Sequence, residues 1–491
     1  MKANPSQPKA SSKTRRSKGR GKKRARTPQN LPVVRPDTAG IDLAVTSEIW
    51  VAVAPDREGE GETVQPFSPM SHGLEALVAY LQAMRITSAA MEATGVYWVA
   101  LYTKLMEAEI DVTLVQPRDV RRLNKPKSDI ADCQWLQYLH SVGLLKKSFV
   151  PPPQILAVRA IARQRERLID EATMHLQHAH QTLDEMNLHV HHVLSDLGGV
   201  SGQAIIEAML AGERDPHKLA ALCHRNVRTD RAIIAQALTG QWRDEQVFVL
   251  RQAYDSWKNT QRQMTECDAR LWELAQALQV RVSEDEIAPQ QPRRRPGRPR
   301  KQSPVKAKVR SRGNSRNGLD DAQDWVSRLH ALFGVDLTAV PGVGLLLTLC
   351  LLVEVGPDWS AFPTAGHFAA WIGLCPHNDR SGKKVLRRRT PPGQTRLKGM
   401  LRVCAQSLCT NQSPLGDHYR RLKARLGPAS ANTAMAHKLA RILWHMVHHQ
   451  VAYDESVFCQ RDQQVIERQT RRLRKQAQSL GFDLTPLSKA A

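Results

Sequence analysis

Hydrophobic and polar positions alternate early in the chain in the manner of half-buried strands. The stretch "TAGIDLAVTSEIWVAVAP" at 38–55 predicts a strand, a short polar turn and a second strand. Helical spacing follows in "GLEALVAYLQAM", and "ITSAAMEA" at 86–93 predicts a third strand. A helix at "VYWVALYTKLMEAE", a strand at 111–117 and a helix after Ser128 complete the series. Strands that alternate with helices indicate an α/β layer with a partly parallel sheet.

The apolar spacing changes after "PPPQ". Two long patterns rich in charge and glutamine, at 155–188 and 244–280, predict helices that pair into a coiled-coil hairpin around a smaller helical insertion. The chain becomes mostly helical again from about 325, except between Pro376 and Gly393. The predicted organisation is a basic tail (1–36), an α/β domain (37–150), a helical hairpin with an insertion (151–283), a basic linker (284–322), a mostly helical C-terminal domain (323–455) and a helical, basic tail (456–491).

Basic residues are concentrated in two segments that cannot form a core. The 491-residue chain has 71 Lys and Arg against 47 Asp and Glu, a formal charge of +24. Residues 1–36 hold twelve Lys and Arg, residues 289–317 hold eleven, and neither segment has an acid, which leaves the rest nearly balanced. Such segments are expected to stay disordered until they bind a polyanion, and nucleic acid fits through phosphate neutralisation. A membrane surface and a purely solubilising role are the alternatives.

Cysteine usage and hydropathy limit the location of the protein. No apolar run is long enough to span a bilayer, and no apolar signal segment follows the basic N-terminus. The eight cysteines form no CxxC pair, which is typical of free thiols in a reducing cytosol. The histidines in "HVHH" at 189–192 have no matched Cys or His cluster that would indicate zinc.

Four acidic residues follow the predicted strands in a fixed order. Strand alternation turns Asp42 away from the face that Ile41 buries, Glu92 ends the third strand, and Asp129 and Asp132 share one face at the start of a helix. Each acid alone is also typical of a turn or a helix N-cap. The ordered set on strand, strand and helix predicts a site for two Mg²⁺ ions, which prefer carboxylate oxygens and act on phosphodiesters.

Two loops carry groups that could contact phosphate. Lys125 and Lys127 precede the acidic pair and could bind the same phosphates as the metal, although a solvated loop explains them equally well. In "VPGVG", Gly342 and Gly344 open a strongly apolar helix whose backbone N–H groups could meet a phosphate. This turn resembles the hairpin of a helix-hairpin-helix, and a plain tight turn is the alternative.

A serine lies inside a dense cationic stretch of the C-terminal domain. A serine hydroxyl is a poor nucleophile until a base, a metal or a field activates it, and nearby cations can hold the phosphate under attack. Ser381 is therefore a candidate nucleophile, while a Ser-Gly turn is the alternative. The cations around it in sequence are Arg380, Lys383, Lys384, Arg387, Arg388, Arg389, Arg396 and Lys398.

The motifs together resemble a known family. "GIDLA", "MEATGVYW", "KSDIADCQWL", "VPGVG", "WIGLCP", "RSG" and "LKGMLRVCAQSL" appear in this order. They resemble the IS110 class of bacterial insertion-sequence transposases, the DEDD recombinases guided by a bridge RNA. The likeness covers about 38–280 and 325–450, and the ordered combination is far more specific than any one motif.

The resemblance implies a RuvC-like domain of the RNase H fold, a coiled-coil hairpin and a C-terminal transposase domain. It makes Asp42, Glu92, Asp129 and Asp132 the Mg²⁺ ligands, and Ser381 the nucleophile that forms a transient phosphoserine link to DNA. The implied partners are DNA at the element ends and target, a structured bridge RNA, and further copies of the chain in a dimer or tetramer. The implied location is the bacterial cytoplasm, at the nucleoid during activity.

The sequence departs from the family pattern in its basic segments and at Lys398, where arginine is expected. The linker holds "RRRPGRPRK", in which Arg295, Arg300 and Lys301 flank the core Gly297-Arg298-Pro299. This resembles an AT-hook, which fits a narrow A·T-rich minor groove. A linker with only electrostatic affinity for DNA or RNA is the alternative.

Three functions compete at this stage. The leading one is a DNA transposase that uses the serine and is assisted by the four acids. The second is a RuvC-like junction nuclease in which metal-activated water cuts DNA. The third is a non-catalytic nucleic-acid-binding protein, and the acids argue against it because they weaken phosphate binding unless metal neutralises them.

Overall fold

The computed structural model of the chain describes most of the elements predicted above. The described residues are 31–43, 48–56, 62–93, 95–120, 129–194, 196–283, 287, 319, 322–381, 384–391, 395–456 and 470–483, without the side chains of 118–119, 322–323 and 377–389. They belong to two compact units, Met1–Val150 and Pro151–Ala491. The predicted residues that lie outside the described part are most of the basic tail, Lys125, Lys127, Lys383 and the AT-hook-like residues Arg295, Arg298 and Arg300.

The first unit is built on a mixed five-stranded sheet in the order β3-β2-β1-β4-β5. Its strands are β1 (Thr38–Asp42), β2 (Ile49–Val53), β3 (Val64–Phe67), β4 (Ser88–Glu92) and β5 (Asp111–Val115). β2 pairs antiparallel with β1 and β3, whereas β4 pairs parallel with β1 and β5. The predicted partly parallel layer is confirmed. β3 was not predicted, because it has four residues and contains Pro66, which only an edge strand tolerates.

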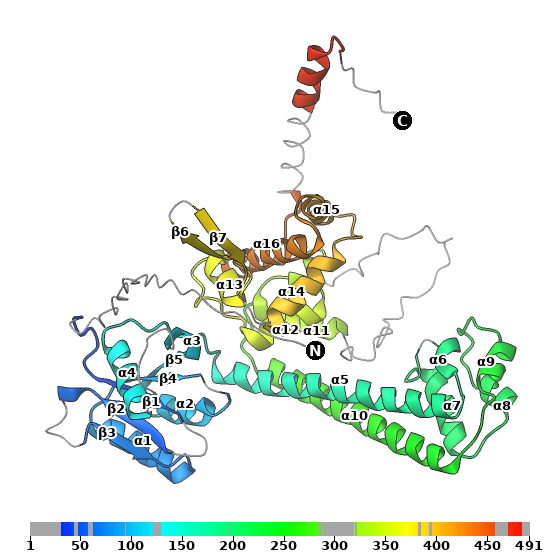
Figure 1. Cartoon of the computed structure of the whole chain (residues 1–491), viewed down its shortest axis with the longest axis horizontal. Helices are drawn as coiled ribbons and strands as arrows, with labels where there is room; N and C mark the ends of the chain where they lie inside the picture. Colours follow the sequence, from blue (N-terminus) through cyan, green and yellow to red (C-terminus); the bar gives the residue numbers. More distant parts are fainter. Residues whose placement is uncertain are drawn as a thin grey trace, which may run out of the picture. The chain divides into compact units, whose positions relative to one another are not determined.

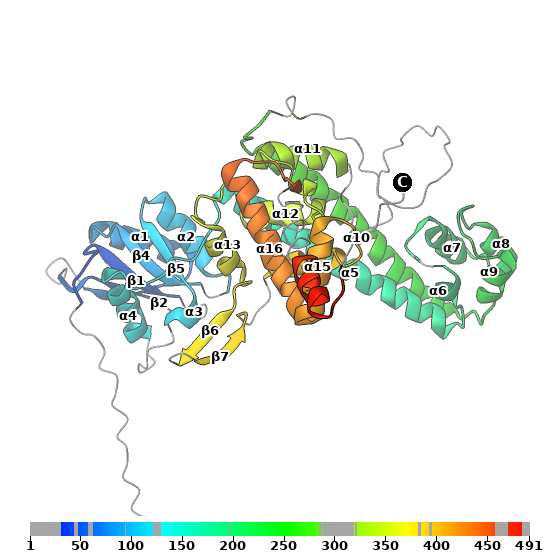
Figure 2. The ribbon, with the colours of Figure 1, turned by 90° about the horizontal axis from the view of Figure 1, so that it is seen from above.

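Helices cover both faces of this sheet. α1 (Ser71–Ala83) and α2 (Trp98–Glu107) lie on one face, and α4 (Asp129–Ser141) lies on the other, with the short α3 (Pro117–Val120) between β5 and α4 (Figures 1 and 2). Ala39 and Ile41 of β1 are buried in the core that includes residues of α1 and α2. The alternate residues Thr38 and Gly40 face α4. Asp42 is two residues after Gly40 and therefore lies on the same face of β1 as Thr38 and Gly40.

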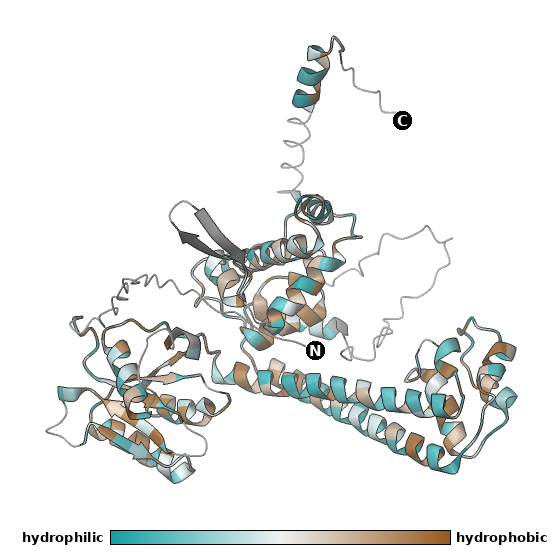
Figure 3. Ribbon diagram, in the orientation of Figure 1, coloured by the Kyte–Doolittle hydropathy of each residue, from teal (hydrophilic) through white to brown (hydrophobic). Residues whose placement is uncertain are grey.

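The second unit begins with a hairpin of two long helices, α5 (Pro153–Glu185) and α10 (Asp244–Gln276). They lie side by side along their length, with charged and polar residues along their outer sides (Figures 1 and 3). A buried ion pair joins Arg165 near the start of α5 to Asp268 near the end of α10, so the two helices run antiparallel. The predicted insertion forms α6 (Val190–Val193), α7 (Val200–Leu210), α8 (Pro216–Ala221) and α9 (Arg231–Ala237) at the hairpin tip.

The rest of the second unit is mostly helical. A β-hairpin fills the interval that the sequence predicts to be non-helical, and its strands are β6 (His377–Ser381) and β7 (Lys384–Arg389). The helices around it are α11 (Ala322–Phe333), a 3₁₀ turn (Leu337–Ala339), α12 (Leu345–Glu354), α13 (Ala365–Ile372), α14 (Arg396–Ser407), α15 (Pro414–Leu426) and α16 (Pro428–His449). Among the described residues, no helix is both long and apolar enough to cross a bilayer.

Two arginines tie the base of the hairpin to the C-terminal helices. Arg159 of α5 donates to the carbonyl oxygens of Val353 and Glu354 at the end of α12, over 3.1 and 2.9 Å. The buried Arg328 of α11 donates to the carbonyl oxygen of Ala275 over 2.8 Å, and also to those of Gln276 and Leu278 at the end of α10. Both guanidinium groups thus satisfy carbonyls that a helix C-terminus leaves unpaired.

Replacing Arg328 with methionine should destabilise the second unit by about 2–4 kcal/mol, because two buried carbonyl groups and one partly buried carbonyl group lose a charged donor. A lower urea midpoint, followed by circular dichroism, would report the loss. The control is Arg262→Met on α10, since Arg262 is exposed and pairs with Glu266 at the i, i+4 position. Equal midpoints for the two variants would contradict a capping role for Arg328.

Candidate active site

Asp42 and Glu92 lie at the same edge of the sheet because β1 and β4 are parallel and in register. Ile41 pairs with Met91, so Asp42 and Glu92 are the next residues along the two strands. Adjacent strands are about 4.8 Å apart, and side chains in register on one face are neighbours. Ser88 of β4 bonds to His140 of α4 over 2.5 Å, which shows that this face of β4 is also the one that α4 covers.

Gly40 brings α4 unusually close to β1. A Cβ atom at this position would lie 2.2 Å from the carbonyl oxygen of Cys133 and 2.3 Å from the amide nitrogen of Gln137. At the start of β1, the Gln137 amide donates to the hydroxyl of Thr38 over 3.1 Å. The C-terminal part of α4 therefore lies near the start of β1, and the first turn of α4 lies at the end where Asp42 is.

Asp42 lies within electrostatic reach of Glu92, Asp129 and Asp132, and these four residues are called the acid cluster. Burial raises the pKa of Asp42 to about 6, and the charges of Asp129, Asp132 and Glu92 contribute in the same direction. A backbone hydrogen bond at Leu43 opposes this shift only in part. The fold thus brings together all four acids that the sequence singled out, within electrostatic reach of Asp42.

The donor set of this cluster suits a hard divalent cation. Four carboxylates that repel one another gain from a cation between them, and oxygen ligands are those that Mg²⁺ prefers. Within the part of the chain that the structure describes, no three His, Cys, Asp or Glu side chains converge closely enough to hold an ion. Asp129 is exposed, and Asp132, Glu92 and Asp42 are half-buried, so cation binding requires these side chains to draw together.

The polar groups beside the cluster stay neutral. Burial raises the pKa of the Cys133 thiol to about 12, and burial lowers the pKa of His140 to about 4. Near neutral pH the thiol is therefore protonated and the imidazole is uncharged. Neither group adds a charge to the acid cluster, which leaves the carboxylate oxygens as its charged ligands.

Ser381 belongs to the second unit, whereas the four acids belong to the first. It is the last residue of β6 and pairs with Lys384 of β7, and the register of this hairpin shifts between Asp379 and Arg380. The predicted cations Arg387, Arg388 and Arg389 lie on β7, and Arg380 lies on β6. The backbone thus places Ser381 at the end of a two-stranded ribbon that carries most of the predicted cations.

Two further predicted cations have partners within the protein. Arg396 is exposed, and its Nε donates to Glu166 of α5 over 2.5 Å. Lys398 is buried, and its ammonium donates to the carbonyl oxygen of Pro391 over 3.1 Å. Burial and the nearby Arg402 lower the pKa of Lys398. The geometry of Lys398 fits an anchor for the segment after β7 better than a phosphate contact.

The predicted glycine turn opens α12. Gly342 has φ +84°, a conformation that favours glycine, and Gly344 is the N-cap of the helix. A Cβ at Gly344 would meet nothing within 4 Å, so this helix start is accessible. In a helix-hairpin-helix, a first helix comes directly before the turn. In this chain a single 3₁₀ turn, Leu337–Ala339, occupies that position.

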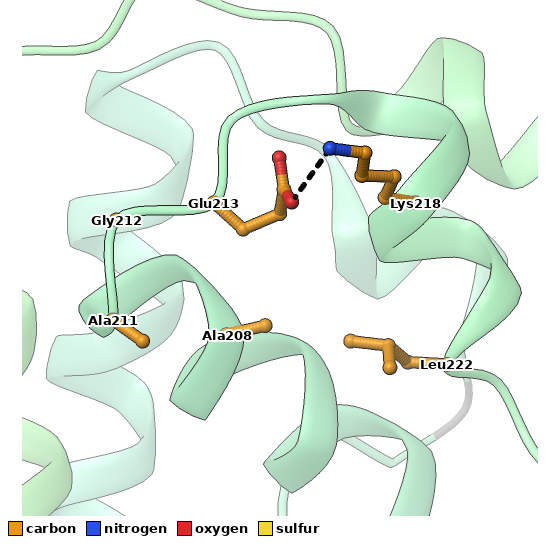
Figure 4. A pocket seen from close by; sticks show the side chains of 6 residues that line it. All are labelled: Ala208, Ala211, Gly212, Glu213, Lys218 and Leu222. Carbon is orange, nitrogen blue, oxygen red and sulfur yellow. Dashed lines mark ion pairs between the residues drawn. The ribbon is translucent and has the colours of Figure 1, made fainter.

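A pocket at the hairpin tip contains none of the predicted site residues. It lies beside α7 and α8, encloses about 450 Å³ and holds one ion pair, between Lys218 and Glu213 at 3.4 Å (Figure 4). Its other lining residues are Ala208, Ala211, Gly212 and Leu222. The pocket offers no cluster of acids or nucleophiles, so the acid cluster of the first unit remains the candidate active site.

Sequence reasoning did not single out Gly40, whose lack of a side chain sets the position of the acidic helix. The available signal was a glycine two residues before Asp42, and therefore on the same face of a strand. A glycine inside a strand pattern often marks a close approach of backbone. Here it decides whether the first turn of α4 can reach Asp42.

Comparisons with known proteins match both units to transposases. Residues 39–188, which contain the four acids, match a family model described as "Transposase". Residues 336–420, which contain the glycine turn and Ser381, match a model described as "Transposase IS116/IS110/IS902 family". Two separate segments of the chain are thus similar to transposase models, and the second of these models is that of the IS116/IS110/IS902 family.

Curated relatives are similar to the chain over part of their length. The chain is 34% identical over 111 residues to an uncharacterized protein of insertion element IS110 from Streptomyces coelicolor. These residues make up 22% of this chain and 27% of the relative. It is 36% identical over 117 residues to a protein from Sinorhizobium fredii that is named as a putative transposase, which is 23% of this chain and 30% of the relative. A protein from Pseudomonas aeruginosa named "Probable family 20 transposase" is 30% identical over 122 residues, and these are 24% of this chain and 36% of the relative. The matches thus span about a third of the relatives or less.

Proposed function

We propose that the chain cuts and rejoins DNA as the transposase of an insertion sequence. The observation that carries this proposal is the acid cluster, in which burial and the charges of Asp129, Asp132 and Glu92 hold the pKa of Asp42 near 6. A mixed sheet with acids at the ends of adjacent parallel strands and on a covering helix supports a RuvC-like form of the RNase H fold. Such a cluster suits phosphodiester chemistry assisted by divalent cations.

In this proposal Asp42, Glu92, Asp129 and Asp132 hold two Mg²⁺ ions. When bound, the ions supply positive charge to the attacking and leaving oxygens of the phosphodiester. Ser381 Oγ attacks phosphorus, a serine–phosphate ester forms, and one P–O bond of DNA breaks. The departing DNA oxygen takes up the proton that Ser381 gives up, and a DNA hydroxyl later reverses the step and rejoins the strand. The ester retains the bond energy that hydrolysis would discard.

Partners follow from the same proposal. Because the acids and Ser381 belong to different units, a dimer or tetramer could complete each site from two chains. The basic tail and linker suit a polyanion, and we infer that a structured bridge RNA selects the DNA by base pairing. The place of action is then the bacterial nucleoid.

A metal-dependent nuclease is the second candidate. The specific observation in its favour is that all four acids lie in one unit, so that metal and water could act there without Ser381. In that case Ser381 only ends a β-strand, and DNA is cut without a covalent protein link.

Denaturing gels of reactions with Mg²⁺, element-junction DNA and RNA from the flanking region separate the two candidates. The transposase proposal predicts a covalent protein–DNA adduct for the wild type and none for Ser381→Ala or Asp129→Ala. Thr390→Ala, just beyond β7, is the hydroxyl control and should keep the adduct. Cut ends without an adduct, in equal yield for the wild type and Ser381→Ala, would contradict the serine mechanism and support the metal-dependent nuclease. Omission of the RNA tests its requirement.

A further inference from the structure

Charge is divided unevenly between the folded parts of the chain. Residues 37–150 carry fifteen Asp and Glu against ten Lys and Arg, whereas residues 361–450 carry fifteen Lys and Arg against Asp379 and Asp417 alone. The nearly balanced remainder expected from the composition therefore combines acidic segments with one strongly basic segment. A polyanion gains its electrostatic affinity from the basic part.

α15 presents much of this charge in one short stretch. Leu415 and Tyr419 bury the inner side of the helix. Four cations within six residues are exposed: Arg420, Arg421, Lys423 and Arg425. Figure 3 shows hydrophilic residues along much of this helix. The inner side anchors α15 to the core, so the cations are held on a rigid helix and not on a loop.

Arg420 has a structural task in addition to its charge. Its guanidinium donates to the carbonyl oxygens of Cys409 and Asn411, over 3.2 and 2.6 Å, and it forms an ion pair with Asp417. The single acid of α15 is thereby neutralised within the helix. Lys423 donates to the uncharged Cys409 Sγ over 3.7 Å and keeps its charge. Arg421, Lys423 and Arg425 are the exposed cations of α15 that follow Arg420.

Neighbouring helices provide no opposing charge. α14 and α16 pack with each other, and α15 packs on α16. Neither the 12 residues of α14 nor the 22 residues of α16 include an acid. Among the side chains that the structure describes between residues 361 and 450, Asp417 is the one carboxylate, and Arg420 pairs with it.

We propose that Arg421, Lys423 and Arg425 form a contact surface for the sugar–phosphate backbone of nucleic acid, additional to the ribbon that carries Ser381. This inference rests on the proposed function for the identity of the polyanion as a nucleic acid, but not on the catalytic mechanism. The match to the family model ends at residue 420, so all three residues lie beyond it. Exposed cations on a rigid helix contact phosphates without reading sequence.

Helix capping and membrane binding account for this surface less well. Cations in the last turn stabilise a helix C-terminus, but this covers Lys423 and Arg425 and not the absence of acids from α14 and α16. An anionic membrane surface needs an exposed apolar face beside the cations. Leu415, Tyr419, Leu439 and Leu443 are buried, and Leu426 is the one large apolar side chain of α15 or α16 that is exposed, which does not make an apolar face.

The test is the salt dependence of nucleic-acid binding by the full chain, measured by fluorescence anisotropy without Mg²⁺. The test variant is R421Q/K423Q/R425Q. The control variant, K258Q/R262Q/R270Q, removes the same charge from α10, where each cation pairs with an acid. Each lost phosphate contact lowers the slope of log K against log salt by about 0.9 on duplex DNA and about 0.7 on single strands. The test variant should therefore lose about 2–3 in slope, equally on unrelated duplexes, and the control should lose none.

The outcomes separate this inference from the proposed function. A loss confined to a flank-derived RNA hairpin, or to duplex DNA, assigns the surface to that nucleic acid. A wild-type slope for the test variant, or equal losses in both variants, overturns the inference. Adduct formation measured on the same preparations tests catalysis separately, so that either idea can fail while the other stands.

Discussion

Replacing Asp42 with asparagine is expected to lower Mg²⁺-dependent strand cleavage by on the order of 10³-fold or more, because the cluster loses its central carboxylate. The metal-free protein should at the same time become more stable at neutral pH. Asparagine keeps the shape of the side chain and removes the charge that Asp129, Asp132 and Glu92 oppose. One substitution thus has opposite effects on catalysis and on folding.

The effect on folding depends on pH in a defined direction. The pKa of Asp42 is 3.8 in its ordinary state and about 6 in the folded protein, so the folded state binds more protons between these values. The stability of the metal-free wild type therefore falls as the pH rises from about 4 through 6. Since Asp42 is partly exposed, solvent screening reduces the cost at pH 7 to about 1–2 kcal/mol.

Thermal unfolding in EDTA at about pH 4.5 and about pH 7.5 measures this effect on either side of the titration. The advantage of Asp42→Asn over the wild type should be present at the higher pH and small at the lower one. Asp111→Asn is the matched control, because Asp111 is exposed at the start of β5 and pairs with Lys147 at 2.6 Å. That control should cleave normally. Equal cleavage by wild type and Asp42→Asn would rule out the acid cluster as the metal site.

The second large effect is expected for Gly40→Ala. The new Cβ would collide with backbone atoms of Cys133 and Gln137, and backbone cannot rotate away as a flexible side chain can. We expect a loss of about 3 kcal/mol or more in the stability of the first unit. Any folded fraction should bind Mg²⁺ weakly, because α4 carries Asp129 and Asp132 away from Asp42.

Limited proteolysis and Mg²⁺ titration by calorimetry would measure both consequences. Gly366→Ala in α13 is the control, since its Cβ would meet only the Thr364 hydroxyl, at 3.5 Å, and alanine favours a helix. A Gly40→Ala protein with wild-type stability and wild-type Mg²⁺ affinity would show that the close approach of α4 does not set the cluster.

Periodicity predicted much of the fold, and alternation predicted the orientation of Asp42. The predicted strands, the helices between them and the long hairpin all have apolar spacings that only one kind of element satisfies. The Asp42 side chain points away from that of Ile41 because side chains alternate along a strand with a period of two residues. The structure agrees with this prediction, since Ile41 lies in the core and Gly40, on the same face as Asp42, lies against α4. Local sequence patterns were thus sufficient to predict both the helices and strands and the orientation of the Asp42 side chain.

Local sequence patterns could not predict features that depend on tertiary contacts. β3 is a four-residue edge strand with a proline, so its apolar signal is weak. Lys398 resembled a surface cation in sequence, yet its stem is buried and its ammonium bonds to the carbonyl of Pro391. The division of charge between an acidic and a basic part was hidden by a balanced total. The place of Ser381 relative to the acids depends on how two units assemble.

The packed contact between α5 and α10, called the seam here, also limits how the length of the hairpin can change. Buried residues on α10 include Leu250, Trp257, Met264 and Leu271, which recur every seven residues. A 33-residue helix is about 50 Å long, and seven residues span about 10 Å. Insertion or deletion of fewer residues would rotate the buried stripe out of the seam. Whole heptads inserted into both helices would therefore lengthen the hairpin in steps of about 10 Å and keep the buried residues in the seam.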